Sequence, residues 1–203
     1  MKKTVHTCFY DSVYPVHEQM PRVFYVEFKE RCVHDKPSVA VSIEGKQIGD
    51  VLTDNAHRED GYRYHDIFHL SYLAVLGWSA CMRKILGKKR KSDAETDEVE
   101  DGARATSVEE GITAVIFNYA EKHNFFEGCS SIDPQFLYFV KIAFTKLEVQ
   151  NKSCEEWQEA ILSGYQVFRQ LKENAGGRVE VNLHEQRLNY VSKFTGKCSS
   201  YAV

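Results

Sequence analysis

Hydrophobic and polar positions follow two different periods along this chain, one typical of strands and one typical of helices. Residues 22–31, 38–44 and 47–52 are rich in β-branched and aromatic side chains that alternate with polar ones, which predicts three short strands. Residues 178–183 alternate in the same way late in the chain. We therefore expect a small antiparallel sheet, formed by the N-terminal strands and this late C-terminal strand.

The helical period appears in four segments, which cover residues 62–86, 104–121, 133–148 and 153–174. Gly77, followed by tryptophan, predicts a kink or a break inside the first. Asp133 before Pro134 is typical of a helix start, and Ser153 opens an S-x-x-E capping box. The fold class expected from these elements is α+β, mainly α: a helical bundle with a small sheet.

Length and composition indicate one folded unit. A chain of 203 residues with 43% hydrophobic side chains can bury one sizeable core. We expect an extended N-terminal segment at 1–21, a single domain at 22–190 and a frayed tail at 191–203. Within the domain, residues 87–103 carry a basic run followed by an acidic run, which predicts a charged loop. A solvated connector, a nuclear import signal and a phosphate- or metal-binding loop all remain open for it.

Charge and cysteine usage exclude several classes of protein. A formal net charge of −3 gives no general electrostatic reason to bind nucleic acid, so no nucleic-acid partner is expected. No window reaches the roughly 18 apolar residues of a membrane span, and the N-terminus lacks the apolar run of a signal peptide. The six cysteines form no C-x-x-C pair, which favours free thiols. We expect a cytoplasmic protein without a membrane partner.

Candidate chemistry is concentrated in residues 62–74. On a helix, Asp66 falls inside the apolar stripe and His69 lies at its edge. A carboxylate that faces the core needs a cation, a metal ion or strong hydrogen-bond donors, because burying it unpaired costs several kcal/mol. His65 and His69 are four residues apart, so both can reach one ion from one helix face.

The second helix and the charged loop add further candidates. Glu109 points near the core, whereas Glu110 either caps the helix through Ser107 or acts as a ligand. Together with the first helix they suggest a site for a hard divalent ion, Mg²⁺ or Mn²⁺, that bridges phosphate oxygens. The cations that we expect to neutralise phosphate are Lys89, Arg90, Lys91 and Arg104.

Several motifs in these segments carry a family resemblance. They are EQMPR at 18–22, LTDNA at 52–56, GYRYHDIFHL at 61–70, LGW at 76–78, KRKSD at 89–93 and DEVEDGARA at 97–105. Together they resemble the domain found at the C-terminus of MazG-type proteins, and the resemblance covers roughly residues 18–183. MazG-type proteins are all-α nucleoside triphosphate pyrophosphohydrolases. The resemblance implies a nucleotide-linked role and, as usual for such enzymes, a homo-oligomer.

This sequence departs from the catalytic MazG pattern, in which an E-x-x-E helix precedes an E-x-x-D helix. Histidines stand in the first helix at 65–69, and Thr113 stands where the aspartate would close the second motif. Either the site is divergent, with mixed His and carboxylate ligands, or the domain binds a nucleotide without cleaving it. An HD-type phosphohydrolase ranks lower, because its further ligands, His57 and Asp133, fall in predicted loops.

The function predicted from the sequence is therefore metal-dependent hydrolysis of a ribo- or deoxyribonucleoside triphosphate to a monophosphate and pyrophosphate. Its catalytic residues are Asp66, Glu109 and His69, and His65 and Glu110 complete the metal shell. The alternative is a catalytically silent nucleotide-binding module. Such a module acts with a partner, either a MazG-type pyrophosphohydrolase or an antiviral effector in phage defence.

Overall fold

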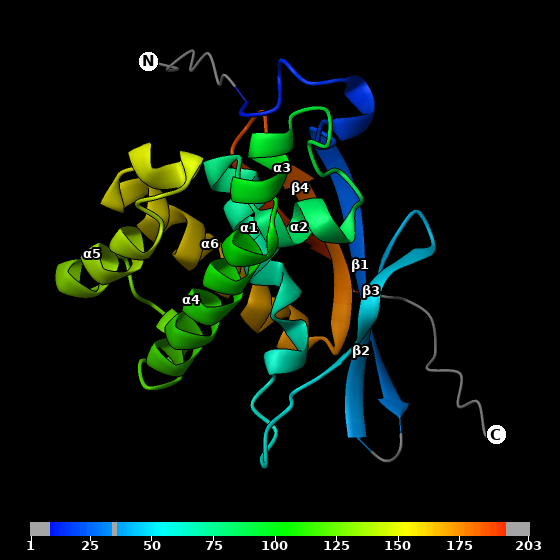
Figure 1. The fold of residues 1–203 in the computed structure, drawn as a ribbon. Coiled ribbons are helices and arrows are strands. Elements are labelled where there is room, and N and C mark those ends of the chain that lie inside the picture. Colours follow the sequence, from blue (N-terminus) through cyan, green and yellow to red (C-terminus); the bar gives the residue numbers. More distant parts are fainter. Residues whose placement is uncertain (1–8, 34–35, 194–203) are drawn as a thin grey trace.

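The computed structural model describes residues 9–33 and 36–193. These residues form an antiparallel sheet with the helices gathered on one of its faces (Figure 1). The α+β fold with mainly helical content is confirmed.

Five strands make the sheet, in the spatial order β3-β2-β1-β4-β5. They are β1 (Val23–Val33), β2 (Lys36–Ile43), β3 (Lys46–Thr53), β4 (Gly176–Asn182) and β5 (Arg187–Ser192). The expected return of the late strand is confirmed, because β4 pairs with β1 along its whole length. The strand β5 was not predicted; it extends the sheet into residues that were expected to belong partly to the tail.

Alternation along the central strand explains which face of the sheet is buried. Phe24, Val26 and Phe28 of β1 are buried, and Phe28 faces Val41 on one side and Gly177 on the other. Gly177 has a φ of 153° and lies under the ring of Tyr190, where an added Cβ would come within 2.4 Å of a ring carbon. Glycine is therefore required for this packing of β4 against β5.

Six α-helices and four short 3-10 turns complete the described fold. The α-helices are α1 (Asp66–Leu76), α2 (Ala80–Ile85), α3 (Ala94–Val99), α4 (Ala103–Glu121), α5 (Pro134–Ala143) and α6 (Cys154–Glu173). The turns are η1 (Val16–Glu18), η2 (Tyr62–Tyr64), η3 (Asn124–Phe126) and η4 (Glu148–Asn151). Figure 1 shows α1 between the sheet and α4, with α5 on the far side of the bundle.

Several helix boundaries differ from the sequence prediction. The segment 62–86 breaks into η2, α1 and α2, because Gly77 ends α1 with a φ of 72° and Ser79 caps α2. The helix predicted at 133–148 ends at Ala143. The alternative of a capping box at Ser107 is wrong, since α4 begins at Ala103 and runs through that residue. The capping box at Ser153 is confirmed.

The helix α1 is buried along its whole length rather than on one stripe. It contacts α6 at close range, where Ser71 donates a hydrogen bond to the carbonyl of Ala160. Gly164 permits this approach, because a Cβ there would lie 3.1 Å from the Ser71 Cβ. A helix enclosed on all sides needs a hydrogen-bond partner for each polar side chain. The polar residues of α1 are therefore the first candidates for a functional site.

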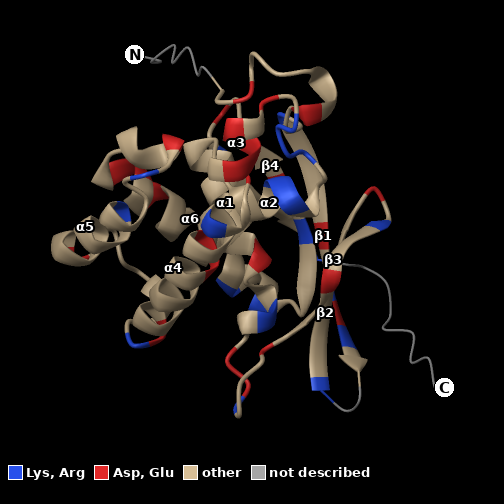
Figure 2. Cartoon of the chain, in the orientation of Figure 1, with Lys and Arg blue, Asp and Glu red and all other residues tan. Residues whose placement is uncertain are grey.

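The charged segment 87–103 is a folded part of the domain, since it contains α3 and several of its charges are paired. Arg90 is fully buried and binds both carboxylate oxygens of Asp101 and of Glu148 at 2.7–3.1 Å. Arg83 donates to Asp11 at 3.0 Å, which holds the N-terminal segment against α2. Figure 2 shows the basic residues around α2 beside the acidic α3. A solvated connector is therefore the wrong interpretation of this segment.

Candidate metal centre

Glu109, on α4, lies at the meeting point of α1, α2 and α4 and is completely buried. Its carboxylate accepts hydrogen bonds from Ser79 Oγ at 2.6 Å, from the backbone N–H of Cys81 at 2.9 Å and from His69 Nδ1 at 2.8 Å. Ser79 and Cys81 begin α2, whose unpaired N–H groups favour a negative charge at that end. The carboxylate is fixed from three directions, which makes it a rigid anchor for the histidine.

His69, on α1, is also completely buried, and its two ring nitrogens have different roles. The partner of Nδ1 is a carboxylate, which can only accept, so Nδ1 must carry the proton. The other nitrogen, Nε2, is buried without a hydrogen-bond partner among the described residues. It lies 3.3 Å from Oε2 of Glu110, close enough for an ion pair but without hydrogen-bond geometry. Buried polar atoms nearly always have a hydrogen-bond partner, so the lack of one at this nitrogen requires an explanation.

His65, immediately before α1, is oriented in a similar way. Its Nδ1 donates to the carbonyl of Tyr62 at 2.9 Å, and its ring stacks on the Tyr62 ring with the centroids 4.6 Å apart. The Nε2 atom is thereby left for another contact and lies 3.6 Å from Oδ1 of Asp66. Both histidines thus hold Nδ1 in a fixed hydrogen bond and offer Nε2, which is the usual arrangement of metal-ligating histidines.

Glu110 completes the cluster from α4. Ligand atoms of His65, His69 and Glu110 lie within 4.8 Å of one another. The Glu110 side chain is half exposed, so the cluster is accessible to solvent from that side. The close approach and the charge of His69 lower the pKa of Glu110 to about 2, although partial burial opposes the shift. At neutral pH this carboxyl group is therefore an anion.

Burial and the charge of Glu109 act in opposite directions on the pKa of His69. Burial by itself lowers the pKa of His69, but the negative charge of Glu109 outweighs it and holds the pKa well above the ordinary value. The same negative charge would favour a divalent ion at Nε2. The donor set fits a metal ion on this ground.

The structure separates the predicted ligands into two groups. His65, His69 and Glu110 lie together, whereas Glu109 supports His69 from behind. Asp66 is buried in the first turn of α1, as its position in the stripe predicted. No cluster of three potential ligands in the described part of the chain includes Asp66. The suggestion that Glu110 merely caps the helix fails, because α4 begins seven residues before it, at Ala103.

The predicted phosphate-binding cations also differ in their surroundings. Arg90 has all five N–H donors engaged by Asp101, Glu148 and the carbonyl of Tyr10, so binding phosphate would require breaking a buried network. Arg90 therefore has a structural role, and its prediction as a phosphate-binding cation is wrong. Lys89 pairs with Asp97 at 2.6 Å. Lys91 and Arg104 are exposed, and their role as phosphate-binding cations remains a prediction.

Ser79 and Cys81 belong to the site but were not singled out in the sequence. The Cys81 thiol lies 3.6 Å from Oε1 of Glu110 and 3.7 Å from the Thr106 carbonyl. Ligand atoms of Cys81, His69 and Glu109 also lie within 4.8 Å of one another. The Gly77 stop signal followed by Ser79 predicts a new helix start, but nothing local shows that this start faces Glu109.

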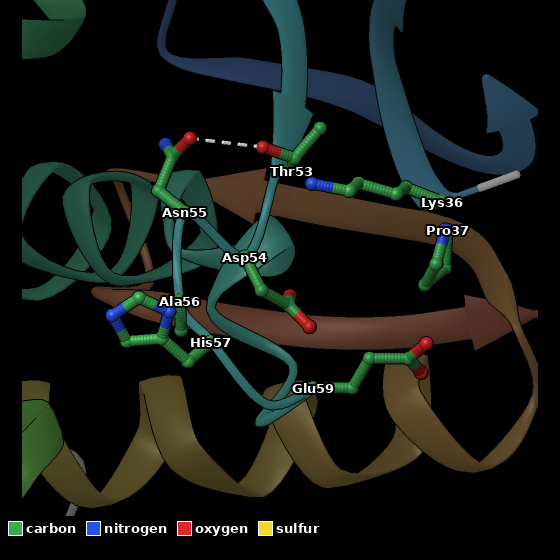
Figure 3. A pocket seen from close by; sticks show the side chains of 8 residues that line it. All are labelled: Lys36, Pro37, Thr53, Asp54, Asn55, Ala56, His57 and Glu59. Carbon is green, nitrogen blue, oxygen red and sulfur yellow. Dashed lines mark hydrogen bonds between the residues drawn. The ribbon is translucent and has the colours of Figure 1, made fainter. Parts of the chain in front are cut away.

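A pocket of about 520 Å³ lies elsewhere, between the start of β2 and the loop after β3. Figure 3 shows Lys36 on one side of it and the carboxylates of Asp54 and Glu59 on the other. Asp54 is committed to the loop, because it accepts from the backbone N–H of Arg63 and from its guanidinium, both at 2.8 Å. The lining of this pocket therefore has mixed charges and no buried donor or acceptor that awaits a ligand.

Comparisons with known proteins give one match. A family model described as the MazG C-terminal domain matches residues 5–194, which is nearly the whole chain. No curated protein and no solved structure matches significantly. None of the helices within residues 9–33 and 36–193 combines the length and the apolar character needed to span a bilayer.

Proposed function

Because the chain belongs to the MazG C-terminal domain family, we propose that it binds a divalent metal ion through His65, His69 and Glu110. The proposed reaction is hydrolysis of a nucleoside triphosphate to a monophosphate and pyrophosphate. The observation that supports this proposal best is the orientation of the two histidines. Each uses Nδ1 in a fixed hydrogen bond and leaves Nε2 for a ligand, and the Nε2 of His69 is buried without a hydrogen-bond partner among the described residues.

A bound divalent ion supplies Lewis-acid polarisation of phosphate oxygens and lowers the pKa of water. The chain's own contribution is to hold and orient the groups around it. Glu109 keeps the proton of His69 on Nδ1, so Nε2 stays a ligand. Asp66, 3.6 Å from His65 Nε2, provides a carboxylate that can accept a proton beside the cluster. Lys91 and Arg104 serve as exposed cations for the phosphate chain.

A cytoplasmic location is part of the proposal, since nucleoside triphosphates are abundant there. The described cysteines are free thiols, which agrees with a reducing compartment. We expect the protein to act as a homo-oligomer, as the family resemblance implies.

The test is release of pyrophosphate from a panel of ribo- and deoxyribonucleoside triphosphates, with added divalent metal ions and with chelator. We expect metal-dependent release that falls at least tenfold in His65→Gln and in Glu110→Gln. His123→Gln is a matched control, because His123 also donates Nδ1 to a tyrosine carbonyl and stacks on that tyrosine, far from the cluster in sequence. Release that persists with chelator, or that is equal in all three variants, would overturn the proposal.

A regulatory module is the second candidate, and a feature of α5 favours it. Tyr138, Phe139 and Ile142 are 63%, 46% and 44% exposed on this helix. Three exposed large apolar residues within five positions are typical of a surface that binds another protein. In this alternative the same metal cluster recognises a nucleotide without cleaving it, and the output is assembly with a partner such as a pyrophosphohydrolase. Nucleotide-induced thermal stabilisation without pyrophosphate release would favour it.

A further inference from the structure

The thiol of Cys81 lies beside the proposed metal centre, and neither the family match nor the motifs assign it a role. It is buried at the start of α2 and touches Oε1 of Glu110, while Nε2 of His69 faces Oε2 of the same carboxylate. His69 belongs to both clusters of potential ligands, the one with His65 and Glu110 and the one with Cys81 and Glu109. Cys81 does not share a cluster with His65 and Glu110, so sulfur joins the shell of a cation at Nε2 of His69 only if a side chain moves.

Two separations between these atoms match those of a tetrahedral shell. With metal–nitrogen and metal–oxygen bonds near 2.1 Å and a metal–sulfur bond near 2.3 Å, tetrahedral ligands lie roughly 3.3–3.6 Å apart. The observed separations are 3.3 Å from His69 Nε2 to Glu110 and 3.6 Å from Cys81 Sγ to Glu110. The two contacts use different oxygens of the carboxylate, so a small rotation of this half-exposed side chain brings one oxygen between them.

The chemistry of the donors selects the class of ion. Mg²⁺ prefers six oxygen ligands and keeps several waters, whereas two imidazoles and a thiol suit a borderline or soft ion such as Zn²⁺. A coordinated zinc ion deprotonates a thiol outright, which means that the bond from sulfur to metal forms as the thiol proton leaves to solvent.

We propose that the centre is a zinc-class site in which Cys81 is the fourth protein ligand, together with His65, His69 and Glu110. The inference rests on the proposed metal centre but not on its catalytic use. It replaces the expectation of Mg²⁺ as the preferred ion. Zinc held by four protein ligands is the arrangement of structural sites, so catalysis at this centre requires one ligand to give way to substrate. The half-exposed Glu110 is the ligand best placed to do so.

The experiment is a spectroscopic titration of the metal-free, full-length protein with Co²⁺, which reports both geometry and sulfur ligation. We expect intense tetrahedral d–d bands and a thiolate-to-cobalt charge-transfer band in the near ultraviolet. Cys81→Ser should lose the charge-transfer band. Cys154→Ser should retain it, because Cys154 is another partly buried free thiol that begins a helix. Zn²⁺ should displace the cobalt at equimolar concentration, and Mg²⁺ in hundredfold excess should not.

A second measurement does not depend on the folding of any variant. X-ray absorption at the zinc edge of the zinc-loaded wild-type protein should show one sulfur neighbour at about 2.3 Å. A cobalt spectrum without a thiolate band, a zinc shell without sulfur, or ready displacement by Mg²⁺ would overturn the inference. Pyrophosphate release with Mg²⁺ in the same sample would then leave the proposed function standing. A thiolate band without hydrolysis of any nucleotide would overturn the function and support the zinc-class site.

Discussion

Replacing Glu109 with glutamine separates the role of this residue in positioning His69 from its role in folding. The amide oxygen can still accept from the Cys81 N–H, so the amide nitrogen must take the place of Oε1, between His69 Nδ1 and Ser79 Oγ. An amide nitrogen only donates, so His69 must release its Nδ1 proton and carry it on Nε2 instead. The ring is then satisfied, but Nε2 is no longer a metal ligand.

Two magnitudes follow from this rearrangement. Loss of the carboxylate partner behind a metal-ligating histidine lowers metal affinity by about 10- to 100-fold. The free energy of unfolding falls because hydrogen bonds are weakened. No cavity forms, because the amide group has nearly the volume of the carboxyl group. We expect about 1–3 kcal/mol from the lost charge-assisted hydrogen bonds. For a domain of this size that lowers the melting temperature by roughly 3–10 °C.

The assay is isothermal titration with Zn²⁺ and with Co²⁺, together with thermal unfolding in chelator. Glu148→Gln is the matched control, because Glu148 is a largely buried carboxylate that accepts two charged hydrogen bonds from Arg90. It should lose comparable stability and keep wild-type metal affinity. Wild-type affinity in Glu109→Gln would refute the reasoning, as would an equal loss of affinity in the control.

Three further predictions concern folding. Arg90→Met should cost about 3–5 kcal/mol in chemical unfolding, because it leaves two carboxylates without their cation; a loss below about 1 kcal/mol would place this network with weak surface pairs. Burial raises the pKa of Asp11, but hydrogen bonds from Arg22 and Met20 outweigh it and leave the pKa lowered. Its stabilisation should be complete above about pH 4 and be lost as the pH falls further, and an equally steep loss in Asp11→Asn would contradict this. Gly177→Ala should destabilise the sheet in thermal unfolding far more than the same change at Gly128, where an added Cβ meets nothing within 4 Å.

Short-range patterns predicted much of the fold correctly. The alternation in β1, β2 and β4, the Asp-Pro start of α5 and the capping box of α6 all depend on neighbours within one turn or one strand. The pattern failed where tertiary contacts override local preference. A solvated connector stayed among the open interpretations of residues 87–103, because the sequence does not show that Arg90 meets Glu148, which lies 58 residues later in the chain. The strand β5 was missed because pairing with β4 stabilises it.

The candidate site shows the same division. The sequence by itself determined that His65, Asp66 and His69 lie close together along one helical segment and that Glu109 faces inward, because helix periodicity is a local property. Only the tertiary structure decided which of these side chains meet. The crossing of α1 and α4 places Glu109 behind His69 and Glu110 in front of it, and the break at Gly77 turns Cys81 back toward both. Contacts between residues distant along the chain depend on how helices pack against one another, and no local pattern encodes that packing.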